Sequence, residues 1–379
     1  ETVKAVGLEL CPALGISIPV GKDSLSMRTQ WKDETGNAKK VTSPVSLIVT
    51  AFATLADVRG SLTPQLNAVD DTSLILVDMG RGQNRMGGSI LAQTLGQMGD
   101  EVPDLDNPQD LVNLVNAVNA LRAQGQILAY HDRSDGGLFA AACEMAFAGH
   151  VGVALNVDML VTEGDGVSDS RMDCGDAKNW AGQISGRRDE LTLKALFSEE
   201  LGVLLQVRTA GRDAVMQVLR EHHLSQHSHV VGKTRPADSS ISAGIGAVQV
   251  WRDAKTIFNA KLADLHQVWD ATSWKICQQR DNPACADAEH AVAGEPSDPG
   301  MHVQLVTSAQ QPAAPALMLS RPKVAVLREQ GVNSHVEMAY AFTEAGFEAY
   351  DVHMTDLQTG RVNLADFKGV VACGGFSYG

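Results

Sequence analysis

Apolar and polar residues succeed one another along the chain in a way that predicts short strands separated by helices. Short apolar runs bounded by glycine, proline or polar residues are typical of buried strands. We expect strands over residues 16–20, 44–53, 72–77, 127–130, 203–207, 324–327, 348–353 and 369–373. Apolar positions at helical spacing predict helices over residues 1–14, 89–98, 111–123, 138–148, 251–279 and 334–345. This succession indicates an α/β or α+β protein.

One polar turn joins a predicted strand to a predicted helix near the middle of the chain. Residues 127–130 have the length and apolar character of a buried strand, and residues 138–148 are apolar on nearly every side, as in a buried helix. The turn between them reads His-Asp-Arg-Ser-Asp-Gly-Gly. Either Ser134 or Asp135 can cap the helix. A helix start of this kind offers backbone N–H groups to an anion.

The residue types in this turn favour a magnesium-nucleotide site. Gly136 and Gly137 carry no Cβ, so their backbone amides can face a phosphate. Asp132 and Asp135 would repel a bare phosphate, which calls for a hard divalent cation between them. Mg²⁺ meets this need because it binds through one or two carboxylates plus phosphate oxygens. The alternative is that these aspartates and glycines only end a strand and cap a helix.

Two other glycine-rich stretches resemble phosphate loops without completing the pattern. Five residues separate Gly15 from Gly21, and an aspartate follows Lys22 where a P-loop has Ser or Thr, so we reject a Walker A motif. Lys22 is either a point charge for a phosphate or a solvated turn lysine. In residues 78–89, Arg85 stands where a dinucleotide fingerprint needs its third glycine, which argues against a Rossmann site.

Composition limits the possible partners and compartment. The 379 residues carry a formal net charge of -14, and no basic stripe occurs, which argues against nucleic-acid or membrane-surface binding. The six cysteines form no CxxC pair and fit reduced thiols in a cytoplasmic protein. No apolar run approaches the ~20 residues of a membrane span, and no signal segment opens the chain. We therefore expect a cytoplasmic protein that binds any phosphate locally.

Two stretches lack regular periodicity and precede new units. Residues 163–188 are rich in Gly, Asp and Ser but do not match a calcium-binding loop, so we expect a surface insert. Residues 281–320 hold repeated prolines among Ala, Ser and Gln and indicate an interdomain linker. A further α/β unit begins at Lys323, and in it Ser334 and Glu337 have the spacing of a capping box.

The chain resembles phosphoribosylformylglycinamidine synthase, the large single-chain amidotransferase family of purine biosynthesis. The likeness lies in residues 11–27, 131–138, 321–339 and 370–379, whose order and spacing also fit, and the insert is the main departure. It implies a synthetase half of the aminoimidazole-ribonucleotide-synthetase type, followed by the start of a class I glutamine amidotransferase domain with a flavodoxin-like fold. The implied parts are the end of an N-type synthetase subdomain over 1–70, a C-type subdomain over 71–250, a helical segment and linker over 251–320, and a truncated glutaminase domain over 321–379.

The resemblance also implies a ligase reaction of de novo purine biosynthesis. In that reaction formylglycinamide ribonucleotide, glutamine and ATP give formylglycinamidine ribonucleotide, glutamate, ADP and phosphate. The implied partners are these substrates and the rest of the same polypeptide, and the implied cofactors are Mg²⁺ and ATP or ADP. Both ends of the sequence read as cut, so we expect an inactive fragment of a longer chain.

The family's site residues carry over onto matching positions of the turn. Asp132 would ligate Mg²⁺, with Asp135 as a further candidate, and Ser134 would contact the nucleotide. Further candidate nucleotide contacts are Lys22, Gly136 and Gly137. The family's other metal ligands would lie before Glu1. In the large enzymes, this second-half site is thought to hold its nucleotide without turnover.

At the other end of the chain, the resemblance places part of a glutaminase. Gly374 and Gly375 resemble the loop whose backbone amides help form the oxyanion hole. The nucleophilic cysteine and its His and Glu partners would lie beyond Gly379. Cys373, which has no paired histidine, is expected to be a small buried hydrophobe.

Two alternatives to the ligase remain open from the sequence. The chain could belong to another ATP-using enzyme of the same superfamily, such as a selenophosphate synthetase or a maturation factor. It could also be a scaffold that holds a nucleotide without turning it over and that organises the catalytic half of the enzyme. The glutaminase-like segment after Lys323 argues against the first alternative.

Overall fold

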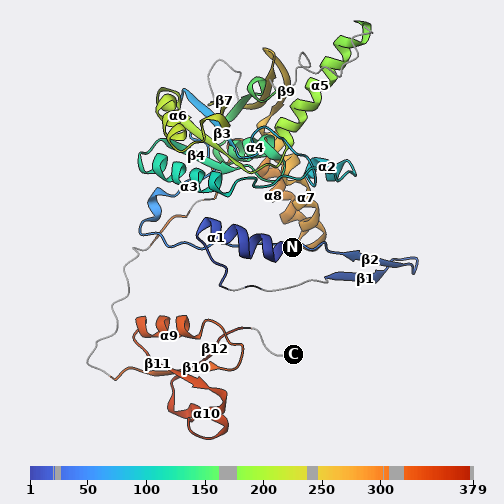
Figure 1. The fold of residues 1–379 in the computed structure, drawn as a ribbon. Helices are drawn as coiled ribbons and strands as arrows, with labels where there is room; N and C mark the ends of the chain where they lie inside the picture. The colour runs from blue at the N-terminus through green and yellow to red at the C-terminus, as the bar shows by residue number, and fades with distance from the viewer. Residues whose placement is uncertain are drawn as a thin grey trace. The chain divides into compact units, whose positions relative to one another are not determined.

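The structure is a computed structural model with two compact units. It describes residues 1–19, 21, 27–161, 177–236, 246–301, 303–306 and 320–375, with backbone only for 177–185. One unit spans Glu1–Asp298 and the other Pro299–Gly379. Figure 1 shows the ribbon of both units.

The first residues form a short helix that ends at a glycine. The helix is of π type over Lys4–Leu10 and continues as α1 over Cys11–Leu14. Pro12 lies in the first turn of α1, where proline is tolerated. Gly15 ends the helix in the left-handed conformation, with φ 70°. The helix predicted over residues 1–14 is therefore confirmed.

An exposed antiparallel hairpin follows, made of β1 (Arg28–Lys32) and β2 (Ala38–Thr42). The Asp33 carboxylate accepts backbone N–H bonds across its turn. The strands predicted on either side, over 16–20 and 44–53, are wrong for the residues that the structure describes there. A strand needs a neighbour for its backbone N–H and C=O groups, and no described strand pairs with these apolar runs.

A seven-stranded mixed sheet forms the centre of the first unit. Its strands are β3 (Thr72–Asp78), β4 (Ile127–Asp132), β5 (Gly152–Asn156), β6 (Gly202–Arg208), β7 (Ser228–Arg235), β8 (Ala247–Arg252) and β9 (Lys255–Lys261). They lie in the order β4-β6-β3-β7-β5-β8-β9. Every neighbouring pair is antiparallel except β5 and β8. The strands predicted over 72–77, 127–130 and 203–207 are confirmed.

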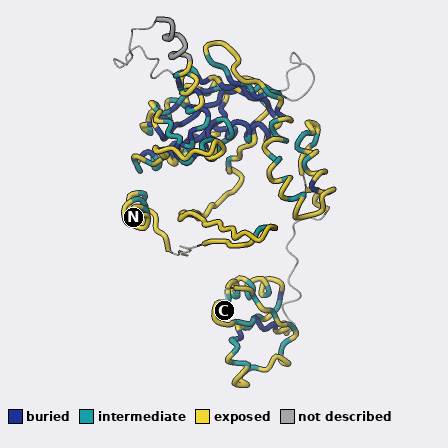
Figure 2. Tube along the Cα trace, turned by 90° about the vertical axis from the view of Figure 1, so that its right-hand side faces the viewer, coloured by how far each residue is buried: buried dark blue, intermediate teal, exposed yellow. Residues whose placement is uncertain are grey.

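Helices cover both faces of this sheet (Figure 1). They are α3 (Pro108–Ala123), α4 (Gly137–Gly149), α5 (Ala177–Phe197), α6 (Arg212–Glu221) and α7 (Leu262–Arg280). Ile75 and Val77 share a hydrophobic core with α3 and α6, whereas Leu74 and Leu76 share the other core with α4, α5 and α7. Successive side chains of a strand point to opposite faces, so β3 supplies both cores in turn. Figure 2 shows the buried residues gathered in this layered part of the unit.

Three predicted boundaries in the first unit need correction. The helix expected over 251–279 begins only at Leu262, because β8 and β9 form a hairpin whose turn residues Asp253 and Ala254 both have positive φ. The expected linker holds a helix, α8 (Pro283–Ala293), capped by the Asn282 side chain. The helix expected over 89–98 is confined to α2 (Ile90–Thr94).

The second unit is a small parallel α/β layer. Its elements are β10 (Lys323–Arg328), α9 (His335–Glu344), β11 (Glu348–His353), α10 (Met354–Gln358) and β12 (Gly369–Ala372). The strand order β11-β10-β12 is parallel throughout, as in a flavodoxin-like sheet. The capping box predicted at Ser334 is wrong: its φ is 65° and its side chain caps nothing. The capping box lies instead at His353 and Asp356, at the start of α10.

Composition led us to expect reduced cysteines and no membrane span. Each described cysteine is a free thiol: Cys11 and Cys143 are buried, Cys277 and Cys373 half-buried, and Cys285 exposed. Among the helices that the structure describes, none has both the length and the apolar content to cross a bilayer. Most of the predicted polar insert, residues 162–176, lies outside the described residues.

Candidate functional site

The polar turn lies at one edge of the central sheet, between β4 and α4. Strands β3 and β4 both pair antiparallel with β6 and therefore run in the same direction. Asp78, at the end of β3, lies opposite Gly202, and Asp132, at the end of β4, lies opposite Val203. The carboxyl ends of the two strands thus meet at one edge, where α/β proteins commonly bind ligands.

A buried arginine anchors the turn. Arg133 is only 4% exposed and forms an ion pair with the carboxylate of Asp78. Its guanidinium also donates to two backbone carbonyls, from Nε to Glu200 at 2.5 Å and from Nη2 to Leu201 at 3.0 Å. Burying a charge is costly unless it is paired and hydrogen-bonded, and here both conditions are met.

Asp78, the partner of Arg133, holds the loop after β3 in place. Besides Arg133, the Asp78 carboxylate accepts the N–H groups of Gly80 at 3.1 Å and Gly82 at 2.7 Å. A Cβ on Gly80 would lie 2.5 Å from the side chain of Glu200, so only glycine fits there. One buried carboxylate therefore fixes both the loop and the turn.

A second ionic contact ties this loop to the start of β6. Glu200 is fully buried and accepts from Arg85 Nε at 2.6 Å, from Nη2 at 2.8 Å and from the Arg85 backbone at 3.0 Å. Arg85 also reaches Asp106 at 3.2 Å. These bonds, with Glu200 contributing most, raise the pKa of Arg85 above its usual range. Sequence reasoning used Arg85 only to exclude a Rossmann site and missed this structural role.

The glycines of the turn do not present free amides. Gly136, with φ 80°, is the N-cap of α4, and no side chain caps the helix there. Its N–H donates to Glu199 Oε1 at 2.8 Å, and the Gly137 N–H donates to the Ser134 carbonyl at 2.9 Å. The expected cap by Ser134 or Asp135 is wrong, and so is the expectation that these two amides are open to phosphate.

Gly137 is required because another backbone passes close to it. A Cβ at this position would lie 2.7 Å from the carbonyl oxygens of both Leu196 and Ser198, and its φ is 68°. Substitution would clash with backbone atoms that cannot rotate away. The segment before β6 therefore packs directly against the turn.

Side chains, not amides, are what the turn displays. Asp132, Ser134 and Asp135 are all exposed. The Tyr130 hydroxyl donates to Asp132 Oδ1 at 2.6 Å and thereby orients this carboxylate. Burial, followed by the bond to Asp132, raises the pKa of Tyr130 above its usual range. An oriented, exposed carboxylate beside a hydroxyl fits the oxygen ligands that Mg²⁺ prefers.

The described residues do not complete a metal site. Within them, no group of three or more His, Cys, Asp or Glu side chains converges in a way that could hold a metal ion. Among these residues, Asp132 alone therefore does not make a metal site. Lys22, the other predicted contact for phosphate, lies outside the described residues.

His131 points its ring into a separate polar contact. Its Nε2 lies 3.0 Å from Glu144 Oε2 on α4, and Glu144 Oε1 accepts from Trp269 Nε1 on α7 at 3.0 Å. The bond to Glu144 raises the pKa of His131, against the opposing effect of burial, and the same bond lowers the pKa of Glu144. The pair links β4, α4 and α7.

The two candidate glycines of the second unit lie against the loop after β10. Gly375 forms a β-bridge with Val332, and the Asn333 N–H donates to the Gly374 carbonyl at 2.9 Å. Cys373 is half-buried instead of fully buried, because it lies at the end of the three-stranded sheet. Its thiol lies 3.9 Å from the Ser334 carbonyl oxygen.

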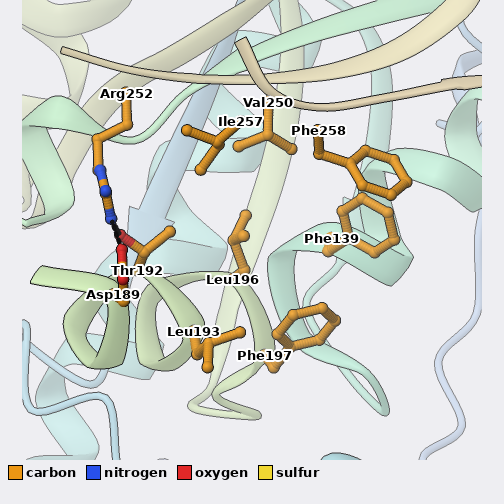
Figure 3. Close-up of a pocket in the computed structure, with 10 residues that line it drawn as sticks. All are labelled: Phe139, Asp189, Thr192, Leu193, Leu196, Phe197, Val250, Arg252, Ile257 and Phe258. Carbon is orange, nitrogen blue, oxygen red and sulfur yellow. Dashed lines mark hydrogen bonds and ion pairs between the residues drawn. The ribbon is translucent and has the colours of Figure 1, made fainter. Parts of the chain in front are cut away.

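An apolar cavity of about 380 Å³ lies among α4, α5, β8 and β9 (Figure 3). Phe139, Phe197 and Phe258 line one side of it. At its opposite end Arg252 donates to Asp189 and to the Thr192 hydroxyl, both at 2.8 Å. Because that guanidinium is already paired and the remaining lining is apolar, the cavity is unsuited to phosphate.

Replacing Arg133 with methionine should destabilise the first unit by about 3–5 kcal/mol, because it leaves the buried Asp78 carboxylate without its cation. Urea unfolding followed by tryptophan fluorescence measures this, since all five tryptophans precede residue 299. Arg59→Ala, which breaks an exposed pair with Asp57, is the control and should change little. A loss below about 1 kcal/mol for Arg133→Met would contradict the anchoring role.

The pair of His131 and Glu144 should make stability depend on pH. The raised pKa of His131 gives stability that is complete below its ordinary value of 6.5 and is lost as pH rises through the folded-state value. The lowered pKa of Glu144 gives stability that is complete above 4.5 and is lost as pH falls. Glu144→Gln should reduce the decline in unfolding free energy between pH 6 and 8, followed by circular dichroism. An NMR titration giving His131 the same pKa in both proteins would refute this.

Three family models match successive parts of the chain. Residues 1–54 match an FGAR-AT PurM_N-like domain. Residues 72–243 match the C-terminal domain of AIR synthase related proteins. Residues 321–379 match a CobB/CobQ-like glutamine amidotransferase domain. These assignments confirm the predicted fold class.

Solved structures similar to the chain include PurL of Thermotoga maritima. PurL complexed with FGAR has 12% identity and a TM-score of 0.37, over 60% of this chain and 30% of that chain. PurLQS from the same organism has 11% identity and a TM-score of 0.36, over 81% and 35%. The E. coli hydrogenase maturation protein HypE has 17% identity and a TM-score of 0.32, over 53% and 52%. The chain thus spans about a third of the PurL chains and half of HypE.

The family assignment rests on the domain models and their order. The match to the C-terminal domain of AIR synthase related proteins does not by itself specify one family of enzymes. The preceding FGAR-AT domain and the following amidotransferase domain restrict the possibilities. The four segments that resembled phosphoribosylformylglycinamidine synthase fall within these three matches. The chain is therefore a protein of the phosphoribosylformylglycinamidine synthase type.

Proposed function

We propose that the chain is part of an ATP-dependent ligase of purine biosynthesis. The whole enzyme would convert formylglycinamide ribonucleotide, glutamine and ATP to formylglycinamidine ribonucleotide, glutamate, ADP and phosphate. The observation that carries the proposal is one chain with an FGAR-AT domain, an AIR synthase C-terminal domain and a glutamine amidotransferase domain. The amidotransferase part would release ammonia from glutamine, and the synthetase part would use it with ATP.

Within this function, the turn after β4 would hold a magnesium-bound nucleotide. Asp132 would be a metal ligand, Asp135 a second candidate, and the Ser134 hydroxyl would contact the nucleotide. Bound Mg²⁺ would neutralise the charge between these carboxylates and the phosphates. The exposure of all three side chains supports this role, as does the hydrogen bond that orients Asp132. Gly136 and Gly137 would act by shaping the turn, since their amides are engaged.

One observation favours a nucleotide that is held without turnover at this site. Of the side chains in the turn that could accept a proton, His131 is bonded to Glu144, and Asp132 and Asp135 are the proposed metal ligands. Arg133 is buried in its ion pair and cannot reach a substrate. The turn is therefore suited to holding a nucleotide and not to turning it over. We propose that it organises the synthetase through bound Mg-ADP or Mg-ATP, while the chemistry proceeds elsewhere in the full protein.

In the glutaminase part, the backbone around Gly374 and Gly375 would contribute to the oxyanion hole. Their contact with the loop after β10 supports this, because it holds the segment in one conformation. A Cβ on Gly375 would lie 2.1 Å from the Gly331 carbonyl oxygen, so the segment depends on glycine there. The nucleophile would come from a cysteine other than Cys373.

Asp132→Ala in the full-length protein should weaken binding of Mg-ADP by roughly 10- to 100-fold, because a direct metal ligand is lost. Isothermal calorimetry measures the affinity, and Asp213→Ala on the exposed face of α6 is the control. Lost nucleotide with normal kinetics would favour the non-turnover role, and lost turnover in a folded protein would favour a catalytic one. Unchanged Mg-ADP affinity would refute the proposed site.

Cys373→Ser in the full-length protein should leave the rate of glutamine hydrolysis unchanged. Its thiol faces a backbone carbonyl, and no described histidine is hydrogen-bonded to it, so it lacks the base that activates a nucleophile. Glutamate release with glutamine as the sole substrate measures the rate. A loss of hydrolysis greater than about tenfold in a folded Cys373→Ser protein would overturn the assignment.

A further inference from the structure

One carboxylate connects the nucleotide turn to a second loop of the same unit. Glu199 Oε1 accepts the N–H of Gly136, at the start of α4, and the N–H of Ile90, at the start of α2, both at 2.8 Å. Ile90 directly follows Ser89, the N-cap of α2. A single oxygen thus accepts from two backbone N–H groups, each at the start of a helix, where such groups have no partner within the helix.

The backbone around Glu199 is fixed independently of these two bonds. On one side, Gly137 packs so closely on the Leu196 and Ser198 carbonyls that no Cβ fits between them. On the other side, the buried guanidinium of Arg133 binds the Glu200 and Leu201 carbonyls. The backbone position from which the Glu199 side chain extends is therefore set by contacts within the unit.

The charge of Glu199 suits its position. Backbone N–H groups at a helix start favour a negative group, which is why such ends often bind phosphate. Here an internal carboxylate takes that place at Gly136. A polyphosphate could reach the same N–H only by displacing Glu199.

We propose that Glu199 is a positioning residue for the nucleotide site. It holds Gly136, and through this residue Asp132 and Ser134, in the conformation that receives a magnesium-bound nucleotide. The nucleotide's phosphates then meet the turn through Mg²⁺ on Asp132 and through the Ser134 hydroxyl, and the Gly136 amide takes no part. This inference rests on the proposed function of Asp132.

A double-mutant cycle in the full-length protein tests this role. Mg-ADP affinity is measured by calorimetry for Glu199→Ala, Glu199→Gln, Asp132→Ala and the double variant Glu199→Ala/Asp132→Ala, with thermal unfolding of each. Glu190→Ala, which removes an exposed carboxylate from α5, is the matched control. Two residues that act through one interaction give non-additive losses, whereas general destabilisation does not.

We expect Glu199→Ala to weaken Mg-ADP about tenfold, since bonds from charged groups to backbone donors are lost. Glu199→Gln should stay within about threefold, because its carbonyl oxygen still accepts both N–H groups. The double variant should bind no more weakly than Asp132→Ala alone. If Glu199→Ala does not fold, Glu199→Asp replaces it: its shorter side chain cannot reach both amides, and we expect a similar loss.

Three results would overturn the inference. Tighter Mg-ADP binding by Glu199→Ala would mean that this carboxylate competes with phosphate for the Gly136 amide. Fully additive losses in the double variant would mean that Glu199 acts independently of Asp132. Unchanged affinity in both Glu199→Ala and Glu199→Asp, with Asp132→Ala impaired, would remove the positioning role and leave the proposed function intact. Failure of the proposed function itself appears as unchanged affinity in Asp132→Ala.

Discussion

The buried ion pair between Arg133 and Asp78 is the constraint on which the site depends. An unpaired charge at this depth would cost several kcal/mol, so the two residues must stay together. Asp78 is the last residue of β3 and Arg133 directly follows β4, so the pair joins the two strand ends from which the connections after β3 and β4 start. Keeping them paired fixes both connections, and Asp132, which directly precedes Arg133, is held at the surface as a result.

Other charged side chains near this pair each hold a different segment of the chain in place. Glu200 binds Arg85 and orders the loop after β3, while its carbonyl helps to satisfy Arg133. Glu199 takes the amides at the starts of α4 and α2. The buried members are matched with partners, and the exposed carboxylates of Asp132 and Asp135 remain for a ligand. Such a division agrees with a turn that binds a magnesium nucleotide and does not itself react.

The sequence predicted local elements better than distant contacts. Apolar runs located β3, β4, β6 and α4, because most residues of these elements are buried or half-buried and therefore apolar. The hairpin of β8 and β9 was missed because its Asp253-Ala254 turn lacks the usual glycine. The exposed carboxylates could be predicted from the motif, but the partners of the turn could not: Gly136 is 63 residues from Glu199, and Arg85 is 115 residues from Glu200. The free-amide hypothesis was wrong at Gly136 for the same reason, since the distant Glu199 carboxylate accepts its N–H, whereas the Gly137 N–H is taken locally by the Ser134 carbonyl.

The most direct test of the central claim is a crystal structure of the full-length protein with ADP and Mn²⁺, in which anomalous scattering locates the metal. The account predicts a metal peak within about 2.0–2.2 Å of an Asp132 carboxylate oxygen, the range for small oxygen-bound divalent ions. It also predicts that the pair of Arg133 and Asp78 remains as described here. Bound ADP whose metal lies away from Asp132, or an Asp132 turn rearranged with Arg133 released from Asp78, would contradict it.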